Sequence, residues 1–297
     1  MKIGKWRADG QALLFLLPFL AVYGIFTIWP MIKGVEMTFY KWTLIRKMKY
    51  IGWDNYQKMF HDQEVWAALW HSAIFVILTT PTMIVLAIAL ALIANRPSRL
   101  QKLYRSVFFL PSVLSVAVAS YLGLFVFQPY NGLVNTFLHL IDVLPENKEL
   151  FWLTELALSW IALTLITLWW TVGFNFILYL SAMQDIPDEI KEAARLDGAS
   201  NSVIFWRITL PYLAPITRTI TMLQIIASFK VFMQIYIITG GGPLDKTRPI
   251  IQLIYQTGFR KNDLGYAATM SYMLFVILLV LSALQYWFNN RKGADAR

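Results

Sequence analysis

Five long runs of this 297-residue sequence contain no charged side chain. A helix of about 20 apolar residues is long enough to cross the hydrocarbon core of a bilayer, which is about 30 Å thick. Each run is long enough for at least one crossing, so a soluble globular fold is excluded. The runs are residues 11–32, 65–94, 106–141, 156–184 and 264–290.

Composition supports a membrane protein. The chain is 58% hydrophobic and 14% charged, whereas soluble domains carry about 25% charged residues. The formal net charge is +9, but the basic residues flank apolar runs and form no concentrated patch, so we expect a lipid bilayer and no nucleic acid as partner. The chain has no cysteine, which excludes disulfides, thiolate metal sites and a cysteine nucleophile.

When the apolar runs are assigned to single membrane crossings, the sequence predicts an all-α membrane protein with six transmembrane helices. The run over 106–141 is too long for one crossing, and "QPYNG" at 128–132 offers an exit turn. A sixth apolar run, interrupted only by Arg218 and Lys230, follows Tyr212. The first run is too long for a signal peptide and no cleavage site follows it, so we expect a retained helix. The predicted spans are about 11–32, 66–94, 107–128, 157–183, 212–239 and 265–289.

The charges between the spans predict the orientation. Basic residues precede the first span, fill the short connection at 96–105 and follow the last span, so the positive-inside rule places both termini in the cytoplasm. The longer loop after the first span breaks the rule, but long loops cross largely regardless of charge. After four crossings the chain is again in the cytoplasm. The exceptional loop contains Lys41, Arg46, Lys47, Lys49 and Lys58.

A charged connector over about 184–211 therefore lies on the cytoplasmic side. Pro187 suits a helix start, Asp188 and Glu189 complement the positive end of the helix dipole, and Gly198 can end the helix in a left-handed cap. Charge runs of this kind are usually solvated connectors. A second helical segment, "NSVIFWRITL", follows at once, which a simple connector would not need.

The stretch "EAARLDGASNSVIFWRITLPYLAP" resembles the EAA loop of permease subunits of binding-protein-dependent ABC importers. In that pattern Glu-Ala-Ala, three residues and Gly precede Ile-x-Leu-Pro, here Ile208 to Pro211. "ITGGGPLDKT", "GYAATMSYMLF" and "LLPFLAVYGIFTIWPMI" with "NYQKMF" are similar to the carbohydrate branch, the maltose-type and glycerol-phosphate-type permeases. The resemblance implies that the loop between the fourth and fifth spans forms a coupling helix in a groove of the ATPase. The implied coupling residues are Glu189, Glu192, Ala193, Ala194, Asp197, Gly198 and Ala199.

The resemblance further implies that residues 1–297 form a single permease domain of an ATP-driven importer of an oligosaccharide or sugar derivative. Its expected partners are a second permease in a heterodimer, two cytoplasmic ATPase subunits and an extracytoplasmic sugar-binding protein. ATP and Mg would bind the ATPase subunits, so we expect no cofactor in this chain and no enzyme activity. The expected location is a bacterial-type cytoplasmic (inner) membrane, crossed several times. The competing class is an autonomous secondary transporter or channel, in which a charged intramembrane relay is expected.

One stretch offers a rival interpretation as an ATPase. "GGGPLDKT" at 240–247 nearly fits the phosphate-binding pattern G-x-x-x-x-G-K-[ST]. Asp245 replaces the second glycine, Pro243 removes a backbone donor, and the predicted topology places the loop outside the cell. A glycine-rich exit turn is therefore preferred. The three histidines are scattered without metal-ligand spacing, so we expect neither a metal site nor catalytic residues.

Polar residues within the spans are the candidates for the substrate path, because such side chains are costly in lipid and tend to face an aqueous cavity. Lys230 could instead snorkel to the outer interface, and the glutamines could bond helices together. Trp169, Trp170, Phe174 and Tyr179 could stack on a sugar or face lipid. The candidates are Asn175, Tyr179, Gln224, Lys230 and Gln234.

Overall fold

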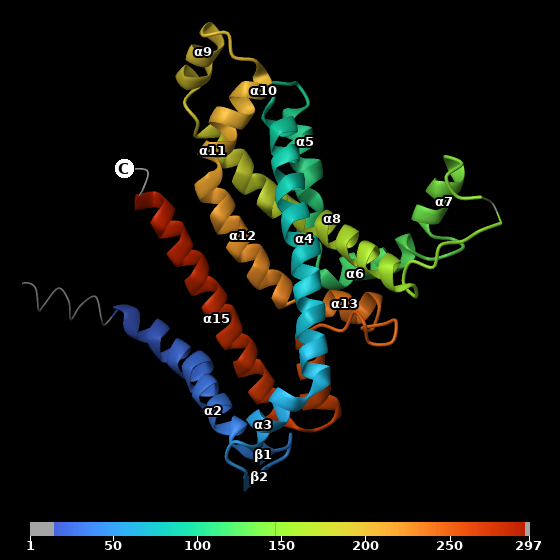
Figure 1. Cartoon of the computed structure of the whole chain (residues 1–297), viewed down its shortest axis with the longest axis vertical. Helices are drawn as coiled ribbons and strands as arrows, with labels where there is room; N and C mark the ends of the chain where they lie inside the picture. The colour runs from blue at the N-terminus through green and yellow to red at the C-terminus, as the bar shows by residue number, and fades with distance from the viewer. Residues whose placement is uncertain (1–14, 146, 295–297) are drawn as a thin grey trace, which may run out of the picture. The chain divides into compact units, whose positions relative to one another are not determined.

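The computed structural model describes residues 15–145 and 147–294, with side chains described as far as residue 287. This part of the chain is mostly helical, as predicted (Figure 1). Its α-helices are α2 Trp29–Thr38, α3 Asp54–His61, α4 Gln63–Asn95, α5 Gln101–Phe109, α6 Val116–Val126, α7 Leu133–Leu140, α8 Leu156–Gln184, α9 Asp188–Leu196, α10 Asn201–Ile204, α11 Leu210–Tyr212, α12 Ala214–Phe229, α13 Met233–Ile238, α14 Ile250–Tyr255 and α15 Leu264–Ala294. Two short strands, β1 Tyr40–Trp42 and β2 Lys47–Tyr50, form an antiparallel hairpin.

The described residues form two compact units. The first contains the residues up to Val65 together with Ile254–Ile277. The second contains Trp66–Leu253 and the described residues from Leu278 onward.

In the first unit, the beginning of α15 lies against the α2–β1 region. Tyr272 donates a hydrogen bond from its hydroxyl to the carbonyl of Met31, and Tyr266 donates to the Asp62 carboxylate at 2.7 Å. Gly265 allows the close approach, because a Cβ at this position would lie 2.2 Å from the carbonyl oxygen of Tyr40. Any larger residue would push α15 away from the strand.

The same unit contains the basic loop that breaks the positive-inside rule. Lys47 on β2 forms an ion pair with Glu36 of α2, and its ammonium lies 3.6 Å from the centroid of the Tyr40 ring. The Glu36 carboxylate raises the pKa of Lys47 above its ordinary value by accepting this hydrogen bond. Lys58 lies over the ring of Tyr266 at 3.9 Å. Local carboxylates and aromatic rings thus accommodate part of the loop's positive charge.

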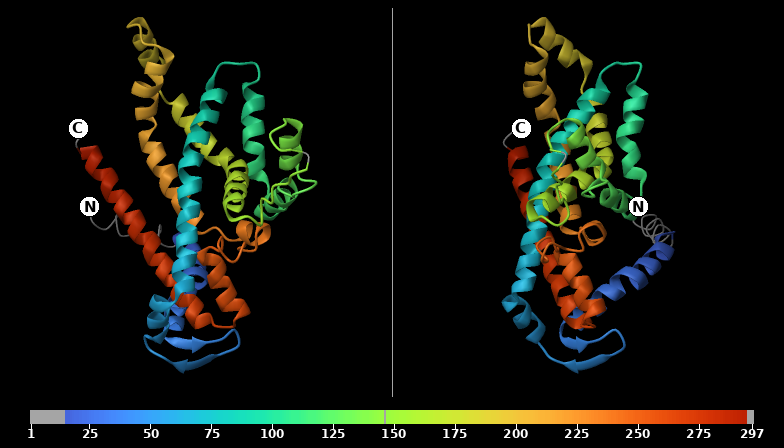
Figure 2. Two further views of the ribbon diagram at one scale, coloured as in Figure 1. Left: turned by 45° about the vertical axis from the view of Figure 1, so that its right-hand side comes forward. Right: turned by 90° about the vertical axis from the view of Figure 1, so that its right-hand side faces the viewer.

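In the second unit, α8 packs against α4, α5 and α12 around an apolar core that includes Met83, Phe176 and Leu213. Gly173 lets α8 approach closely, since a Cβ there would come within 2.8 Å of the Phe108 carbonyl oxygen. The views agree that the segment from α9 to α11 lies at the same end of this unit as the connection between α4 and α5 (Figures 1 and 2). That connection is part of the basic stretch at 96–105.

Four predicted spans correspond to continuous helices. Among the described residues, the helices long and apolar enough to cross a membrane are Phe15–Thr38, Gln63–Asn95, Leu156–Gln184 and Leu264–Trp287. They match the predicted spans at 11–32, 66–94, 157–183 and 265–289. The first four residues of the first predicted span, 11–14, lie outside the described residues, as do both chain ends.

The predicted span at 107–128 is not one straight helix. The helical segments Gln101–Val113 and Val116–Val126 meet at an angle of 99°. Pro111 lies in a 3₁₀ turn at the end of the first segment, and Ser115 begins the second by accepting a hydrogen bond from the backbone amide of Val118 at 3.3 Å. A serine in this position is a common start signal, so α6 begins as a new helix instead of continuing the old one.

The predicted span at 212–239 is also interrupted. α12 ends at Phe229 and α13 begins at Met233, with Phe232 in a non-helical conformation at φ −144° and ψ −73°. α13 packs mainly on α6, whereas α12 packs on α8. No Pro or Gly lies at the break, so it follows from different packing partners and has no marker in the sequence.

A buried polar network organises the segment between α6 and α8. Asn135 of α7 donates hydrogen bonds to the Pro129 carbonyl at 2.6 Å and to the Glu149 carboxylate at 2.7 Å. Its side-chain oxygen accepts a hydrogen bond from the Trp152 indole at 2.7 Å. Nearly every hydrogen-bonding position of the Asn135 amide is therefore used, which fixes α7 against the chain that leads into α8.

Candidate functional site

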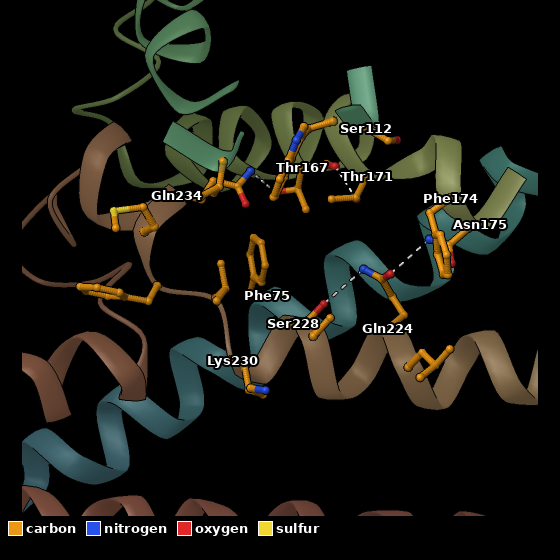
Figure 3. A pocket seen from close by; sticks show the side chains of 17 residues that line it. Phe75, Ser112, Thr167, Thr171, Phe174, Asn175, Gln224, Ser228, Lys230 and Gln234 are labelled. Atoms are coloured by element: carbon orange, nitrogen blue, oxygen red, sulfur yellow. Dashed lines mark hydrogen bonds between the residues drawn. The ribbon is translucent and has the colours of Figure 1, made fainter. Parts of the chain in front are cut away.

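A cavity of about 770 Å³ lies within the second unit (Figure 3). Side chains of α4, α8, α12 and α13 line it, together with residues from the bend before α6 and from the break at 230–232. Both interruptions of the predicted spans therefore contribute to the cavity wall. Ligand sites commonly have this size and a mainly apolar lining with a few polar groups.

Amides and hydroxyls form two hydrogen-bonded groups on this wall. Asn175 donates to Gln224 at 3.4 Å, and Gln224 donates to the hydroxyl of Ser228 at 3.4 Å. On the other side, Gln234 donates to the hydroxyl of Thr167 at 2.8 Å. Figure 3 shows Phe75 between the two groups. Amides and hydroxyls both donate and accept hydrogen bonds, so this wall suits a ligand with many hydroxyl groups.

Aromatic rings provide the apolar part of the lining. Trp170 donates its indole N–H to the carbonyl of Leu114 at 2.9 Å, which satisfies a backbone group at the bend before α6. Phe75, Phe174 and Phe232 also line the cavity. Flat apolar rings beside amides and hydroxyls give the cavity two kinds of contact with one ligand, apolar stacking and hydrogen bonding.

The structure brings together four of the five residues predicted for the substrate path: Asn175, Gln224, Lys230 and Gln234 all line the cavity. Tyr179 does not, because it is fully buried in the core and donates its hydroxyl to Thr217 at 3.1 Å. Among the aromatic candidates, Trp170 and Phe174 line the cavity, whereas Trp169 does not.

The sequence analysis missed the hydroxyl residues of the cavity. They are Ser112, Thr167, Thr171 and Ser228. Thr167 and Thr171 each donate to a backbone carbonyl four residues earlier, an arrangement that any transmembrane helix tolerates. Their only sequence signal is one-turn spacing with Asn175 along α8, since positions 167, 171 and 175 share a face.

The predicted coupling segment forms a helix with no buried residue among its own side chains. Asp188 and Glu189 lie in the first turn of α9, as expected. Ile190 is 44% exposed and Leu196 is 90% exposed, so α9 presents apolar as well as charged groups outward. A surface with both properties suits a protein partner more than water alone.

The end of α9 confirms the predicted left-handed cap. Gly198 has φ +83°, and its backbone amide donates to the Arg195 carbonyl at 3.0 Å. The amide of Ala199 donates to the Ala194 carbonyl at 2.9 Å. These two bonds make a Schellman motif, which satisfies the terminal carbonyls and turns the chain sharply.

The chain after this turn is also helical, as predicted for the second segment. Ser200 caps α10 by accepting a hydrogen bond from the amide of Val203, and a π-helical turn, Phe205–Thr209, leads to α11. The hydroxyl of Tyr212 donates to the carbonyl of Asp185 at 3.3 Å, which joins the two ends of the segment. The segment from α9 to α11 is thus a closed helical hairpin with a defined base.

The glycine-rich loop at 240–247 folds without the arrangement of a phosphate-binding loop. A helix, α13, precedes it, whereas the phosphate-binding motif follows a strand. Gly240 and Gly241 adopt positive φ angles, and the Thr247 hydroxyl donates to the carbonyl of Gly242 at 2.6 Å. Internal hydrogen bonds therefore occupy part of the polar backbone that would have to contact a phosphate.

The family model described as "Binding-protein-dependent transport system inner membrane component" matches residues 68–293, which include the cavity and the α9–α11 segment. The chain belongs to this family. This family consists of transport permeases and not of enzymes.

Two relatives match this protein over almost its whole length. The probable ABC transporter permease YurN of Bacillus subtilis is 31% identical over 278 residues, which cover 93% of this chain and 94% of YurN. The lactose transport system permease LacF of Rhizobium radiobacter is 31% identical over 283 residues, with 94% of each chain covered.

A solved structure has the same fold. A chain of the bacterial alginate ABC transporter, crystallised in complex with an alginate pentasaccharide-bound periplasmic protein, superimposes with a TM-score of 0.85. The identity is 23%, and the match covers 97% of this chain and 96% of that one. The fold is therefore that of an ABC transporter permease.

Proposed function

We propose that this permease carries a sugar through the cavity of the second unit as one subunit of an ATP-driven importer. The observation that carries the proposal is the cavity wall, where paired amides and hydroxyls lie beside Phe75, Trp170 and Phe174. Such a wall offers hydrogen bonds to sugar hydroxyls and flat faces for sugar rings. The names of the relatives are consistent with it, since LacF belongs to a lactose system and the solved neighbour to an alginate transporter.

The proposed topology has six spans and both termini in the cytoplasm of a bacterial cell. Four continuous helices cross the bilayer, α5 and α6 form a bent third crossing, and α12 with α13 form a broken fifth. Broken helices are tolerated at membrane depth where they line a cavity, which is where both interruptions lie. The α9–α11 segment then shares the cytoplasmic side with the basic connection between α4 and α5.

The proposed partners are a second permease, two cytoplasmic ATPase subunits and an extracytoplasmic sugar-binding protein. ATP and Mg would bind to the ATPase subunits. α9 would dock on one of them, with Glu189, Glu192 and Asp197 available to pair with basic groups and with Ala193, Ala194 and Ala199 allowing close approach. The exposed Ile190 and Leu196 support this assignment, because their side chains are uncovered in the described chain.

In this mechanism, movement of the ATPase subunits on binding ATP would displace the helical hairpin from α9 to α11. Its base is joined by the Tyr212–Asp185 hydrogen bond, and α12 follows directly, so the displacement reaches the cavity wall at Gln224 and Ser228. The cavity would thereby change its access from one side of the membrane to the other.

Copurification and uptake test the proposal. Purification of the tagged chain from its native membrane should recover a second permease, an ATPase and a binding protein, and mass spectrometry of the binding protein should identify a sugar. Proteoliposomes containing this assembly should accumulate that sugar only when ATP is present on the side of the membrane that carries the ATPase subunits. Gln224→Leu should reduce uptake, while Gln184→Leu, at an exposed position at the end of α8, should not.

Uptake by the chain without ATPase subunits would favour the competing class, an autonomous secondary transporter or channel. Equal uptake by the Gln224→Leu and Gln184→Leu variants would remove the cavity from the sugar path.

A further inference from the structure

Lys230 is the only residue with a charged side chain among the described residues that line the cavity. It lies directly after α12, at the break before α13, and its side chain is exposed. No carboxylate of the described chain forms an ion pair with it. Asp245, an acidic residue of the loop after α13, pairs with Arg248 at 3.3 Å.

The length of α12 places the backbone of Lys230 inside the membrane, close to its outer boundary. α12 has 16 residues and therefore rises roughly 24 Å at about 1.5 Å per residue. This length is about 6 Å shorter than the hydrocarbon core of about 30 Å, so a helix that starts at the cytoplasmic boundary places the backbone of Lys230 just inside the outer boundary. Its side chain either extends to the outer interface or faces the cavity, and the cavity lining includes it. A cation at this depth is costly unless it faces water or a partner charge.

The surroundings of Lys230 compensate its charge only in part. The terminal carbonyls of α12 carry the negative end of the helix dipole, equivalent to about half an elementary charge. The other polar groups on the wall are amides and hydroxyls, which are neutral. The described wall therefore has an excess of positive charge beside its hydrogen-bonding groups and aromatic rings.

We propose that the cavity selects a sugar that carries a negative group, either a carboxylate or a phosphate, and that Lys230 pairs with it. This inference rests on the proposed function and names the substrate class of the same cavity. Amides and hydroxyls of α8, α12 and α13 bind the sugar hydroxyls, and Lys230 supplies the charge that separates anionic from neutral sugars.

A cysteine at Ala227 measures the charge of the cavity in the assembled transporter. Ala227 lines the cavity, is exposed and precedes Lys230 by three residues, and the chain has no cysteine of its own. The assay compares the modification rates of Ala227→Cys by an anionic and a cationic methanethiosulfonate reagent. Lys230→Gln should lower the ratio of anionic to cationic rates about tenfold, since charges a few Å apart interact strongly at an effective dielectric constant of about 20.

Two controls accompany the measurement. Lys230→Arg should keep the ratio, because it keeps the charge. A cysteine at the exposed Ile45, in the loop between β1 and β2, should show the same ratio with and without Lys230. An Ala227→Cys ratio that does not change in Lys230→Gln would show that the charge is neutralised in the complex, and the inference would be wrong.

Protection by small sugars identifies the substrate class. Glucuronate, glucose 1-phosphate and glucose are compared at equal ionic strength for their ability to slow modification of Ala227→Cys by neutral N-ethylmaleimide. One or both anionic sugars should protect at lower concentration than glucose, and their order separates carboxylate from phosphate recognition. Lys230→Gln should remove the advantage of the anionic sugars.

Equal protection by all three sugars, or an anionic advantage that persists in Lys230→Gln, would overturn the inference and leave the sugar path intact. Protection by none of them, together with unimpaired modification, would also overturn the inference. The proposed function fails separately, when the assembled transporter shows no ATP-dependent uptake of the sugar found on its binding protein, so the two failures have different readouts.

Discussion

Replacement of Gly198 by residues with a Cβ strains one backbone turn and leaves the surroundings of that turn unchanged. Gly198 adopts φ +83°, and no other atom lies within 4 Å of the position that a Cβ would occupy. A substitution therefore creates no steric clash, and its cost is confined to the left-handed backbone conformation. The series Gly198→Asn, Gly198→Ala and Gly198→Val should show rising cost, because Asn tolerates this conformation and β-branched residues resist it.

The size of the effect on the α9 cap follows from the backbone conformation of residue 198 alone. The left-handed conformation costs an ordinary residue roughly 1–2 kcal/mol, which lowers the ratio of capped to uncapped α9 by a factor of about 5–30. The uncapped helix loses the Ala199–Ala194 and Gly198–Arg195 hydrogen bonds, and with them the direction in which the chain enters α10. Gly198→Ala should fall in this range and Gly198→Val above it.

The assay measures two quantities on the same preparation: retention of ATPase subunits on the purified permease, and ATP-dependent uptake in vesicles. The amount of permease in the membrane should stay close to wild type, because α9 has no buried residue. Uptake should be highest in Gly198→Asn, lower in Gly198→Ala and lowest in Gly198→Val. Gly240→Val is the matched control, since Gly240 also has a positive φ, +64°, and open surroundings but lies in the loop after α13.

Wild-type ATPase retention and uptake in Gly198→Val would refute the assignment of α9 as the coupling helix. An equal loss of ATPase subunits in Gly240→Val would show that the effect is general destabilisation and not a local change in docking.

Three further predictions concern other parts of the chain. Lys246→Ala should leave nucleotide binding by the assembled complex unchanged, as measured with a fluorescent ATP analogue; ATP binding by the chain alone that this change removes would contradict us. In membranes that contain the permease without its ATPase subunits, cysteines placed at the highly exposed Leu196 and Leu244 should be labelled by an impermeant maleimide from opposite sides of the membrane, and labelling from one side would exclude six spans. Asn135→Ala should lower stability by about 1–3 kcal/mol, seen as a lower thermal midpoint, because the buried Trp152 indole loses its acceptor; an unchanged midpoint would show that water replaces the amide.

The sequence predicted α9 and four continuous spans because their signals are local. Acidic residues at a helix start, a glycine at its end and long uncharged runs each act within a few turns of the chain. Ser115 is a local signal of the same kind, directly before an apolar run. A closer examination of "PSVLSV" could have predicted that α6 begins there.

The break at 230–232 and the cavity depend on contacts between distant residues. Asn175 and Gln224 are 49 positions apart, so their hydrogen bond exists only after α8 and α12 have packed together. Tyr179 lies one turn beyond Asn175 on the same helix, yet it points into the core and bonds Thr217. Polarity selected Asn175 and Gln224, and the aromatic ring selected Tyr179. Neither property separates the cavity from the core.

The gap between α12 and α13 has a mechanical consequence. A continuous helix over 212–239 would act as a rigid rod, so that a tilt at one end would appear at the other. The gap leaves the two helices free to tilt separately: α12 follows the hairpin from α9 to α11 and packs on α8, whereas α13 packs mainly on α6. In the proposed mechanism this gap would let the inner end of the path open without the same tilt at its outer end, and Lys230 lies at the start of the gap.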